Sequence, residues 1–211
     1  MQEAPADEGE IFSAPLEDQE SGRLVVACGI ARLTVGANES RAELYQAHFE
    51  GPSPNVKAKE GVITIRYPRR LLGLGKKQGA AEVMLNGAIP WRIVIQGGAA
   101  EVAVGGLDLA GLEIMGGFST VRLDLLAPSS VVPIRISGGA AEIAVRRPAG
   151  VAVRVKLKGW VSQLVFDEQT FTEVGKVDNN LPLQSPGFDP AAPYYDIEVR
   201  GYTNTLTITS G

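Results

Sequence analysis

The sequence GGAAEVAV at residues 97–104 returns as GGAAEIAV at residues 138–145, and GAAEVML at residues 79–85 repeats most of it. Each copy opens with glycine and alanine and continues as a run in which apolar and polar residues alternate. Alternation with a period of two indicates a strand with one buried face, and paired glycines allow a sharp change of direction. The sequence therefore predicts a corner followed by a strand, used several times in one chain.

The glycine that opens each copy belongs to a longer repeat of about twenty residues. An alternating strand also runs into the corner, as in WRIVIQ at residues 91–96 and PIRIS at residues 133–137. A strand–corner–strand unit of this length cannot bury its apolar face alone, but stacked units can. The equivalent glycines, the last about two periods after the one before it, are Gly79, Gly98, Gly117, Gly139, Gly159 and Gly201.

This repeat predicts an all-β protein, a single-domain parallel β-solenoid with rungs of about twenty residues, each rung pairing with the next. Ile95, Ile114 and Ile136 lie three residues before their glycines, so we expect them to point inward together. We expect Gly98 and Gly139 to occupy places that exclude a side chain. The alternative is an antiparallel β-sandwich, because short strands and frequent glycines also suit hairpins. The recurrence of one corner at one period favours the solenoid.

The repeat predicts a solenoid domain over residues 22–211, preceded by an acidic segment at residues 1–21. A long excursion interrupts it at residues 167–194, where Pro, Gly, Asp and Asn are frequent. Apolar residues are also spread through this excursion, so we expect it to be ordered and to pack against the solenoid. Aromatic residues in and around it form the predicted partner surface: Trp160, Phe171, Phe188, Tyr194 and Tyr195.

The sequence at residues 97–125, GGAAEVAVGGLDLAGLEIMGGFSTVRLDL, resembles the core of the toast-rack domain of proposed bacterial adhesins and LiaF-like cell-wall stress-response proteins. Residues 33–67 look like the opening units of that family, and residues 184–208 look like its closing segment. The resemblance implies a β-solenoid with a structural or adhesive role, and it supplies no catalytic residues. The chain differs from LiaF-like proteins in lacking their membrane helices.

Composition argues against several kinds of partner. The chain has 20 basic and 24 acidic residues, a net charge of −4 and no basic block, so we expect no nucleic acid partner. No apolar run approaches the roughly 20 residues of a membrane span. The first residues, MQEAPADEGE, lack the basic and apolar regions of a signal peptide. A cytoplasmic location therefore stays open beside the cell envelope or extracellular location that the resemblance suggests.

The residue types needed for catalysis or metal binding are few. His48 is the only histidine and Cys28 the only cysteine, and Cys28 is predicted to be a small core residue. The sequence GLGKK at residues 73–77 lacks the spacing of a phosphate-binding loop. We therefore expect no catalytic residue, no cofactor and no metal site.

Carboxylates could still form a row along a solenoid. Aligned on the glycines, Glu82, Glu101 and Glu142 share one position, and Thr120 interrupts the row. Like charges at rung spacing repel, so the alignment predicts a solvated outer face. The basic residues expected to balance it are Arg92, Arg122 and Arg135.

These observations together predict a non-catalytic structural or adhesin-like interaction module of the bacterial cell envelope. Its expected partner is a protein or an envelope component, and self-association is a further expectation. Two alternatives remain open at this point. One is a polysaccharide-acting enzyme on a β-helix, which rests on analogy of fold alone. The other is a self-assembling scaffold, because the ends of a solenoid expose strand edges that can pair.

Overall fold

The computed structural model describes residues 10–27, 29–67, 79–175 and 183–211. These residues form one 15-stranded sheet and contain no helix. Most neighbouring strands pair in parallel, which excludes the antiparallel sandwich. The predictions made for Cys28 and for residues 73–77 fall outside the described residues.

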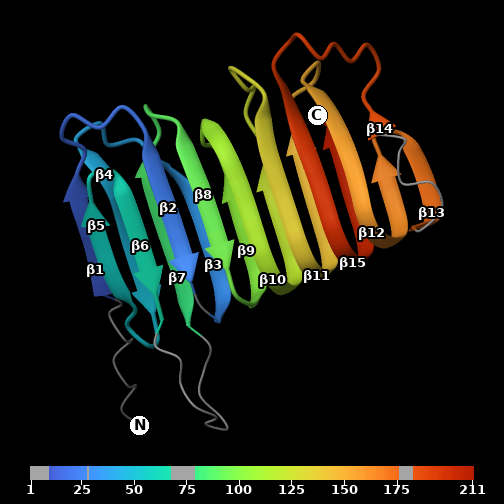
Figure 1. Ribbon diagram of the computed structural model, residues 1–211. Helices are drawn as coiled ribbons and strands as arrows, with labels where there is room; N and C mark the ends of the chain where they lie inside the picture. The colour runs from blue at the N-terminus through green and yellow to red at the C-terminus, as the bar shows by residue number, and fades with distance from the viewer. Residues whose placement is uncertain (1–9, 28, 68–78, 176–182) are drawn as a thin grey trace, which may run out of the picture.

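The strands, in chain order, are β1 (Glu10–Pro15), β2 (Gly22–Ala27), β3 (Ile30–Asn38), β4 (Glu43–Glu50), β5 (Asn55–Lys59), β6 (Val62–Arg66), β7 (Ala80–Asn86), β8 (Trp91–Gln96), β9 (Ala99–Gly105), β10 (Leu109–Asp124), β11 (Val132–Arg147), β12 (Ala152–Phe166), β13 (Gln169–Gly175), β14 (Leu183–Gln184) and β15 (Tyr194–Ser210). They stand side by side along the molecule, from β1 and β5 at one end to β13 and β14 at the other (Figure 1).

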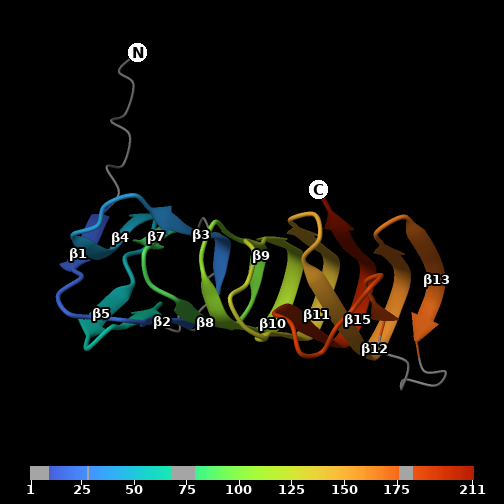
Figure 2. The same ribbon diagram turned by 90° about the horizontal axis from the view of Figure 1, so that it is seen from above.

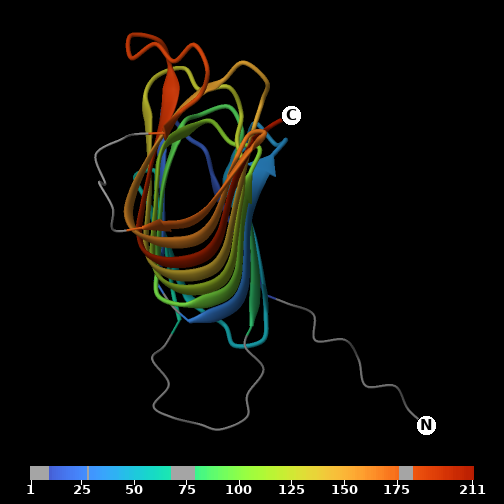
Figure 3. The ribbon, with the colours of Figure 1, turned by 90° about the vertical axis from the view of Figure 1, so that its right-hand side faces the viewer.

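The strands make two walls that face each other across the core, as the view from above shows (Figure 2). The first wall contains β5, β6, β2, β8, the first halves of β10, β11, β15 and β12, and then β14. The second wall contains β1, β4, β7, β3, β9, the second halves of those long strands, and then β13. Each long strand bends once and belongs to both walls, so the end-on view shows nested U-shaped turns (Figure 3).

The order of the units in space differs from their order in the chain. The unit made of β2 and β3 lies between β6–β7 and β8–β9, and β15 lies between β11 and β12. Stacking in simple sequence order, as the repeat predicted, is therefore wrong at both ends. A unit can be inserted in this way because all units present similar strand edges, and each edge accepts any strand of matching register.

Branched aliphatic side chains fill the space between the walls. Ile95, Ile114 and Ile136 are 3%, 0% and 4% exposed and lie side by side in the parallel ladder, so their predicted inward direction is confirmed. Val199 of β15 and Leu157 of β12 continue the same row. The row follows from alternation along each strand, because every second side chain faces the core.

A column of glycines forms the bend between the walls. The stacked residues are Gly97, Gly116, Gly138, Gly201 and Gly159, in that order. A Cβ atom added to Gly116 would lie 1.8 Å from the carbonyl oxygen of Gly97, and one on Gly138 would lie 1.9 Å from that of Gly116. No such contact can be accommodated without moving the backbone.

The expectation that Gly139 excludes a side chain is therefore wrong by one residue, whereas the expectation for Gly98 is met in part. A Cβ atom on Gly139 would have its nearest neighbour at 3.9 Å, and one on Gly117 would have none within 4 Å. Gly98 is tighter, at 3.1 Å from the carbonyl oxygen of Gly117. In the pairs Gly116–Gly117 and Gly138–Gly139 the severe exclusion belongs to the first glycine, because a carbonyl oxygen of the neighbouring rung points at its Cα.

The excursion at residues 167–194 contributes two strands. β13 pairs antiparallel with β12 in the second wall, and β14 pairs antiparallel with β12 in the first. Phe171, Val174 and Leu183 pack against the core, so these described parts pack back as expected. At the other end, β1 lies within the predicted acidic segment and pairs with β4.

Replacing a glycine of the column should destabilise the chain strongly. Gly138 has a φ of +114°, so Gly138→Ala combines strain with a clash, and we expect a loss of about 2 kcal/mol or more of unfolding free energy. Gly117→Ala is the matched control, one residue after the column glycine of the neighbouring strand, and should change stability by less than about 0.5 kcal/mol. Urea denaturation measures both. Equal losses in the two variants would contradict the assignment of the column.

Truncation of the central ladder should create a cavity. We expect Ile114→Ala to lower the free energy of unfolding by about 2–5 kcal/mol, because the three side-chain carbon atoms beyond Cβ are removed from between two packed neighbours. Arg92→Ala, on the exposed side of the adjacent strand, should stay within about 0.5 kcal/mol of the wild type. Thermal and chemical denaturation should rank the variants in this order, and the reverse order would mean that the two faces are exchanged.

Candidate interaction surface

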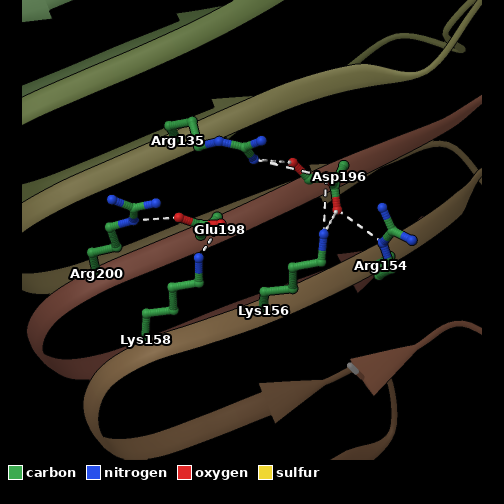
Figure 4. Close-up of polar contacts among 7 residues, drawn as sticks. All are labelled: Arg135, Arg154, Lys156, Lys158, Asp196, Glu198 and Arg200. Carbon is green, nitrogen blue, oxygen red and sulfur yellow. Dashed lines mark hydrogen bonds and ion pairs between the residues drawn. The ribbon is translucent and has the colours of Figure 1, made fainter. Parts of the chain in front are cut away.

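The outer face of the first wall carries a cluster of charged residues over β11, β15 and β12. β15 supplies two carboxylates, and the strands on either side supply most of the cations (Figure 4). All these side chains point outward because they occupy alternate positions along their strands. We call this set the basic cluster: Arg135, Arg154, Lys156, Lys158, Asp196, Glu198 and Arg200.

Asp196 is held by cations from both neighbouring strands. Arg154 Nε donates a hydrogen bond to its Oδ1 at 2.9 Å, and Lys156 Nζ lies 3.3 Å from the same atom. From the opposite side, Arg135 Nη1 lies 3.8 Å from Oδ2 and donates to the Asp196 carbonyl oxygen at 3.4 Å. The side chain is consequently well covered, and Asp196 is only 7% exposed.

Glu198 lies two residues further along β15 and is covered in the same way. Lys158 Nζ is 3.1 Å from Oε2, and Arg200 donates from Nε to Oε1. Glu198 is 4% exposed, whereas Lys158 and Arg200 each keep about half of their side-chain surface in solvent. The cations thus form the solvent-facing layer, and the carboxylates lie beneath it.

The charges around these carboxylates decide their protonation. Burial alone would raise the pKa of Asp196, but the hydrogen bond from Arg154 and the attraction of Lys156 lower that pKa below its ordinary value. Burial would likewise raise the pKa of Glu198, and the hydrogen bonds from Arg200 and Lys158 bring that pKa down. Both groups are therefore carboxylates at neutral pH, and the cluster of five cations and two anions keeps a positive charge on a chain whose net charge is −4.

The predicted row of glutamates is only partly present. Glu101, Thr120 and Glu142 align across β9, β10 and β11, but Glu82 pairs with Thr34 on the inserted strand β3 and falls two positions away. The prediction that Glu82 shares the row is wrong because it rested on Gly79, which lies outside the glycine column.

The arginines that were expected to pair with this row of glutamates also differ in part from those observed. Arg122 Nη1 lies 2.6 Å from Glu101, and Arg32 Nε lies 3.0 Å from its other oxygen. These hydrogen bonds lower the pKa of Glu101. Arg135 instead serves Asp196 on the first wall. The outer face of the second wall thus carries one compact trio, Arg32–Glu101–Arg122.

The five aromatic residues predicted as a partner surface are separated by the structure. Tyr195 is 1% exposed, and its hydroxyl donates to the Leu126 carbonyl oxygen at 2.8 Å. Burial raises the pKa of Tyr195 to about 12. Its side chain is therefore part of the core and not of a surface, because β15 enters the stack at this residue. Phe171 is half-buried against the core on β13.

Phe188 and Tyr194 form a small aromatic pair beside the basic cluster. Their ring centroids are 4.8 Å apart in an edge-to-face arrangement, and the guanidinium carbon of Arg154 lies 5.1 Å from the Tyr194 ring centroid. Tyr194 itself is buried and Phe188 half-buried, so the pair mainly supports Arg154. Of the five predicted residues, Trp160 is the one with a large exposed ring, at 38%.

The basic cluster was missed at the level of sequence, although its signal is visible. RVKLK at residues 154–158 places cations at alternate positions, and DIEVR at residues 196–200 places carboxylates at the matching ones. The two segments are 42 positions apart, and pairing them requires the knowledge that β15 enters between β11 and β12.

Neither a metal-type cluster among the described residues nor a raised carboxyl pKa in the basic cluster points to catalysis. They contain no group of three or more His, Cys, Asp or Glu side chains that could hold a metal ion. A glycosidase needs one carboxyl group whose pKa is raised, whereas the pKa values of both Asp196 and Glu198 are lowered. A search of the described residues also finds no helix with the length and apolar character of a membrane span.

The lowered pKa values make stability depend on pH. In the unfolded chain Asp196 and Glu198 return to ordinary pKa values of 3.8 and 4.5, so the unfolded state takes up protons first as the pH falls. Their stabilising contribution is full above those values and disappears as the pH falls through the folded pKa values. We expect the free energy of unfolding to decrease between about pH 6 and about pH 3 in a urea series.

The double variant Asp196→Asn with Glu198→Gln should be less stable at neutral pH and show a shallower decrease. Glu20→Gln, at an exposed position outside the strands, is the control and should leave the slope unchanged. A slope in the double variant as steep as that of the wild type would assign the pH dependence to other groups.

Comparisons with known proteins agree with this architecture. Residues 2–146 match the family model for the N-terminal domain of toast_rack, DUF2154. No curated protein matches the sequence. A proposed cell adhesion protein from Clostridium sporogenes ATCC 15579 has a TM-score of 0.76 at 19% identity, with 96% of this chain and 99% of that chain covered. This likeness shows a shared fold.

A second solved structure is a more distant neighbour. A proposed adhesin from Bacteroides fragilis NCTC 9343 has a TM-score of 0.35 at 7% identity, with 93% of this chain and 97% of that chain covered, and no structural argument rests on it. The family match extends over well more than half of the sequence and confirms the resemblance seen in the repeat units. The chain belongs to the toast-rack family.

Proposed function

We propose that this chain is a non-catalytic, adhesin-like interaction module of the bacterial cell envelope, built as a parallel β-solenoid over residues 22–211. The nested U-shaped turns and the parallel ladders support the solenoid. The name of the Clostridium sporogenes protein, which refers to cell adhesion, supports a role at the cell surface.

The observation that carries the proposal is the layered basic cluster. Two carboxylates lie buried on the outer face of a wall, and five cations cover them and face the solvent. Well-packed apolar side chains often stabilise a protein at least as well as a buried network of ion pairs, so stability alone does not account for this cluster. An outward positive layer on a rigid wall is well suited to recognition of an anionic partner, because charge complementarity gives both selectivity and fast association.

Catalysis on polysaccharides, the alternative function, gains no support from the same residues. Asp196 and Glu198 are each engaged by two or more cations, which leaves neither free to protonate a leaving group or attack a sugar. A rigid sheet that presents long side chains at fixed spacing is suited to binding. The proposal therefore assigns these residues to an interaction surface.

Sedimentation with isolated bacterial cell walls tests the proposal. We expect labelled chain to pellet with the walls in a saturable manner. In the triple variant Lys158→Gln, Glu198→Gln, Arg200→Gln, which removes two cations together with the carboxylate that they cover, the bound fraction at a subsaturating concentration should fall about tenfold.

The second wall offers a matched control for this experiment. The triple variant Arg32→Gln, Glu101→Gln, Arg122→Gln removes two cations and one carboxylate, the same charges, from the opposite face and should bind like the wild type. Equal loss in both triple variants would contradict the assignment to the first wall. Absence of pelleting by the wild type, or release of soluble sugar from the walls, would contradict the proposed function itself.

A further inference from the structure

Two large aromatic residues lie side by side on the outside of the bend. Trp160 on β12 and Tyr202 on β15 are paired in the parallel ladder and are 38% and 54% exposed. Neighbouring strands of a sheet are about 4.8 Å apart, so the two side chains leave the backbone close together. Single exposed hydrophobic residues are common on protein surfaces, whereas these two occupy paired positions on neighbouring strands.

Contacts within the sheet hold Tyr202 across the ladder. Its hydroxyl lies 3.3 Å from Ser162 Oγ on β12, two residues beyond Trp160. The Tyr202 ring therefore leans from its own strand over the strand that carries Trp160. On the other side of Tyr202 the paired residue is Gly139, followed by Gly117, so the two paired positions in that direction carry no side chain.

The basic cluster begins two residues before these rings on the same strands. Lys158 and Arg200 are paired with each other across β12 and β15 and point outward, as Trp160 and Tyr202 do. Among the described residues, Arg200 contacts Glu198 through Nε, which leaves its two Nη groups facing solvent. A guanidinium fork of this kind binds a carboxylate through two hydrogen bonds.

We infer that Trp160, Tyr202, Lys158 and Arg200 form a binding site for an acidic polysaccharide. The inference rests on the proposed function and names its partner. Flat faces of sugar rings carry C–H groups that pack on the electron-rich faces of Trp and Tyr, and acidic groups of the same polymer pair with Lys158 and Arg200. A polymer that runs along either strand meets first the cations and then the rings, which explains why both features occur together.

The two tryptophans make the site observable by fluorescence. Trp91 is fully buried in the core and Trp160 is exposed, so a ligand on the site should shift only the emission of Trp160. We expect titration with polygalacturonate to move the emission of the wild type to shorter wavelength, and titration with dextran, which is neutral, to leave it unchanged. Trp160→Phe should keep binding and lose the spectral shift.

Affinity measured by calorimetry with the same two polymers completes the test. Trp160→Ala and Tyr202→Ala should each weaken polygalacturonate binding about tenfold, and Tyr202→Phe should retain most of it. Leu126→Ala, which truncates an exposed hydrophobic residue on a connection, is the control and should bind like the wild type. Unchanged melting temperatures exclude a loss of fold, since both rings are exposed.

Four results would overturn the inference. Binding of polygalacturonate that is unaffected by both alanine variants would place the polymer elsewhere, and equal binding of dextran would remove the role of the cations. Failure of polygalacturonate to bind while bacterial cell walls still bind would overturn the inference and leave the proposed function standing. If neither polygalacturonate nor bacterial cell walls bind, both the inference and the proposed function are contradicted.

Discussion

The close approach of backbones at the bend is the constraint on which the whole structure depends. At Gly116, Gly138, Gly201 and Gly159 a Cβ atom would come within 2 Å of the carbonyl oxygen of the neighbouring glycine, so each of these rungs can stack on its neighbour only because its own residue at the bend lacks a side chain. Once the bend is set, the ladder fixes the register of both walls, and the isoleucine, leucine and valine rows follow from alternation. The single column of glycines therefore sets the alignment of both the core and the outer faces.

Insertion of β15 between β11 and β12 places two carboxylates among the cations on the outer face of the first wall. In this register Arg135 of β11 and Lys156 of β12 lie on either side of Glu198. If β12 stacked directly on β11 in the same register, these cations would be opposite each other, and like charges at that position destabilise a sheet. The carboxylates of β15 therefore favour its position between β11 and β12 over other positions in the sheet. The same pairing leaves a layer of cations facing the solvent.

The direction of the core side chains could be predicted from the alternation of apolar and polar residues. The stacked glycine of each doublet and the order of the units in space could not. The inward direction of Ile95, Ile114 and Ile136 follows from alternation alone. A doublet such as Gly138–Gly139 does not say which glycine is stacked, and the carbonyl contact that decides it is invisible in a linear chain. Because the units have similar edges, their order in space depends on connections such as the excursion, so the meeting of Asp196 with Arg135 and Arg154 could not be predicted.

Trp160 and Tyr202 directly follow column glycines, at a position that is less restricted sterically in β10 and β11. In β10 and β11 a side chain would have room at this position, since a Cβ atom on Gly117 would meet nothing within 4 Å and one on Gly139 nothing closer than 3.9 Å. The bend is made by the preceding glycine, so the fold requires no bulky group here, and in β10 and β11 glycine is sufficient. Aromatic rings held half in solvent at the rungs of β15 and β12 lose favourable burial and bring no packing that the core needs. A ligand that contacts both the rings of Trp160 and Tyr202 and the neighbouring cations accounts for their position.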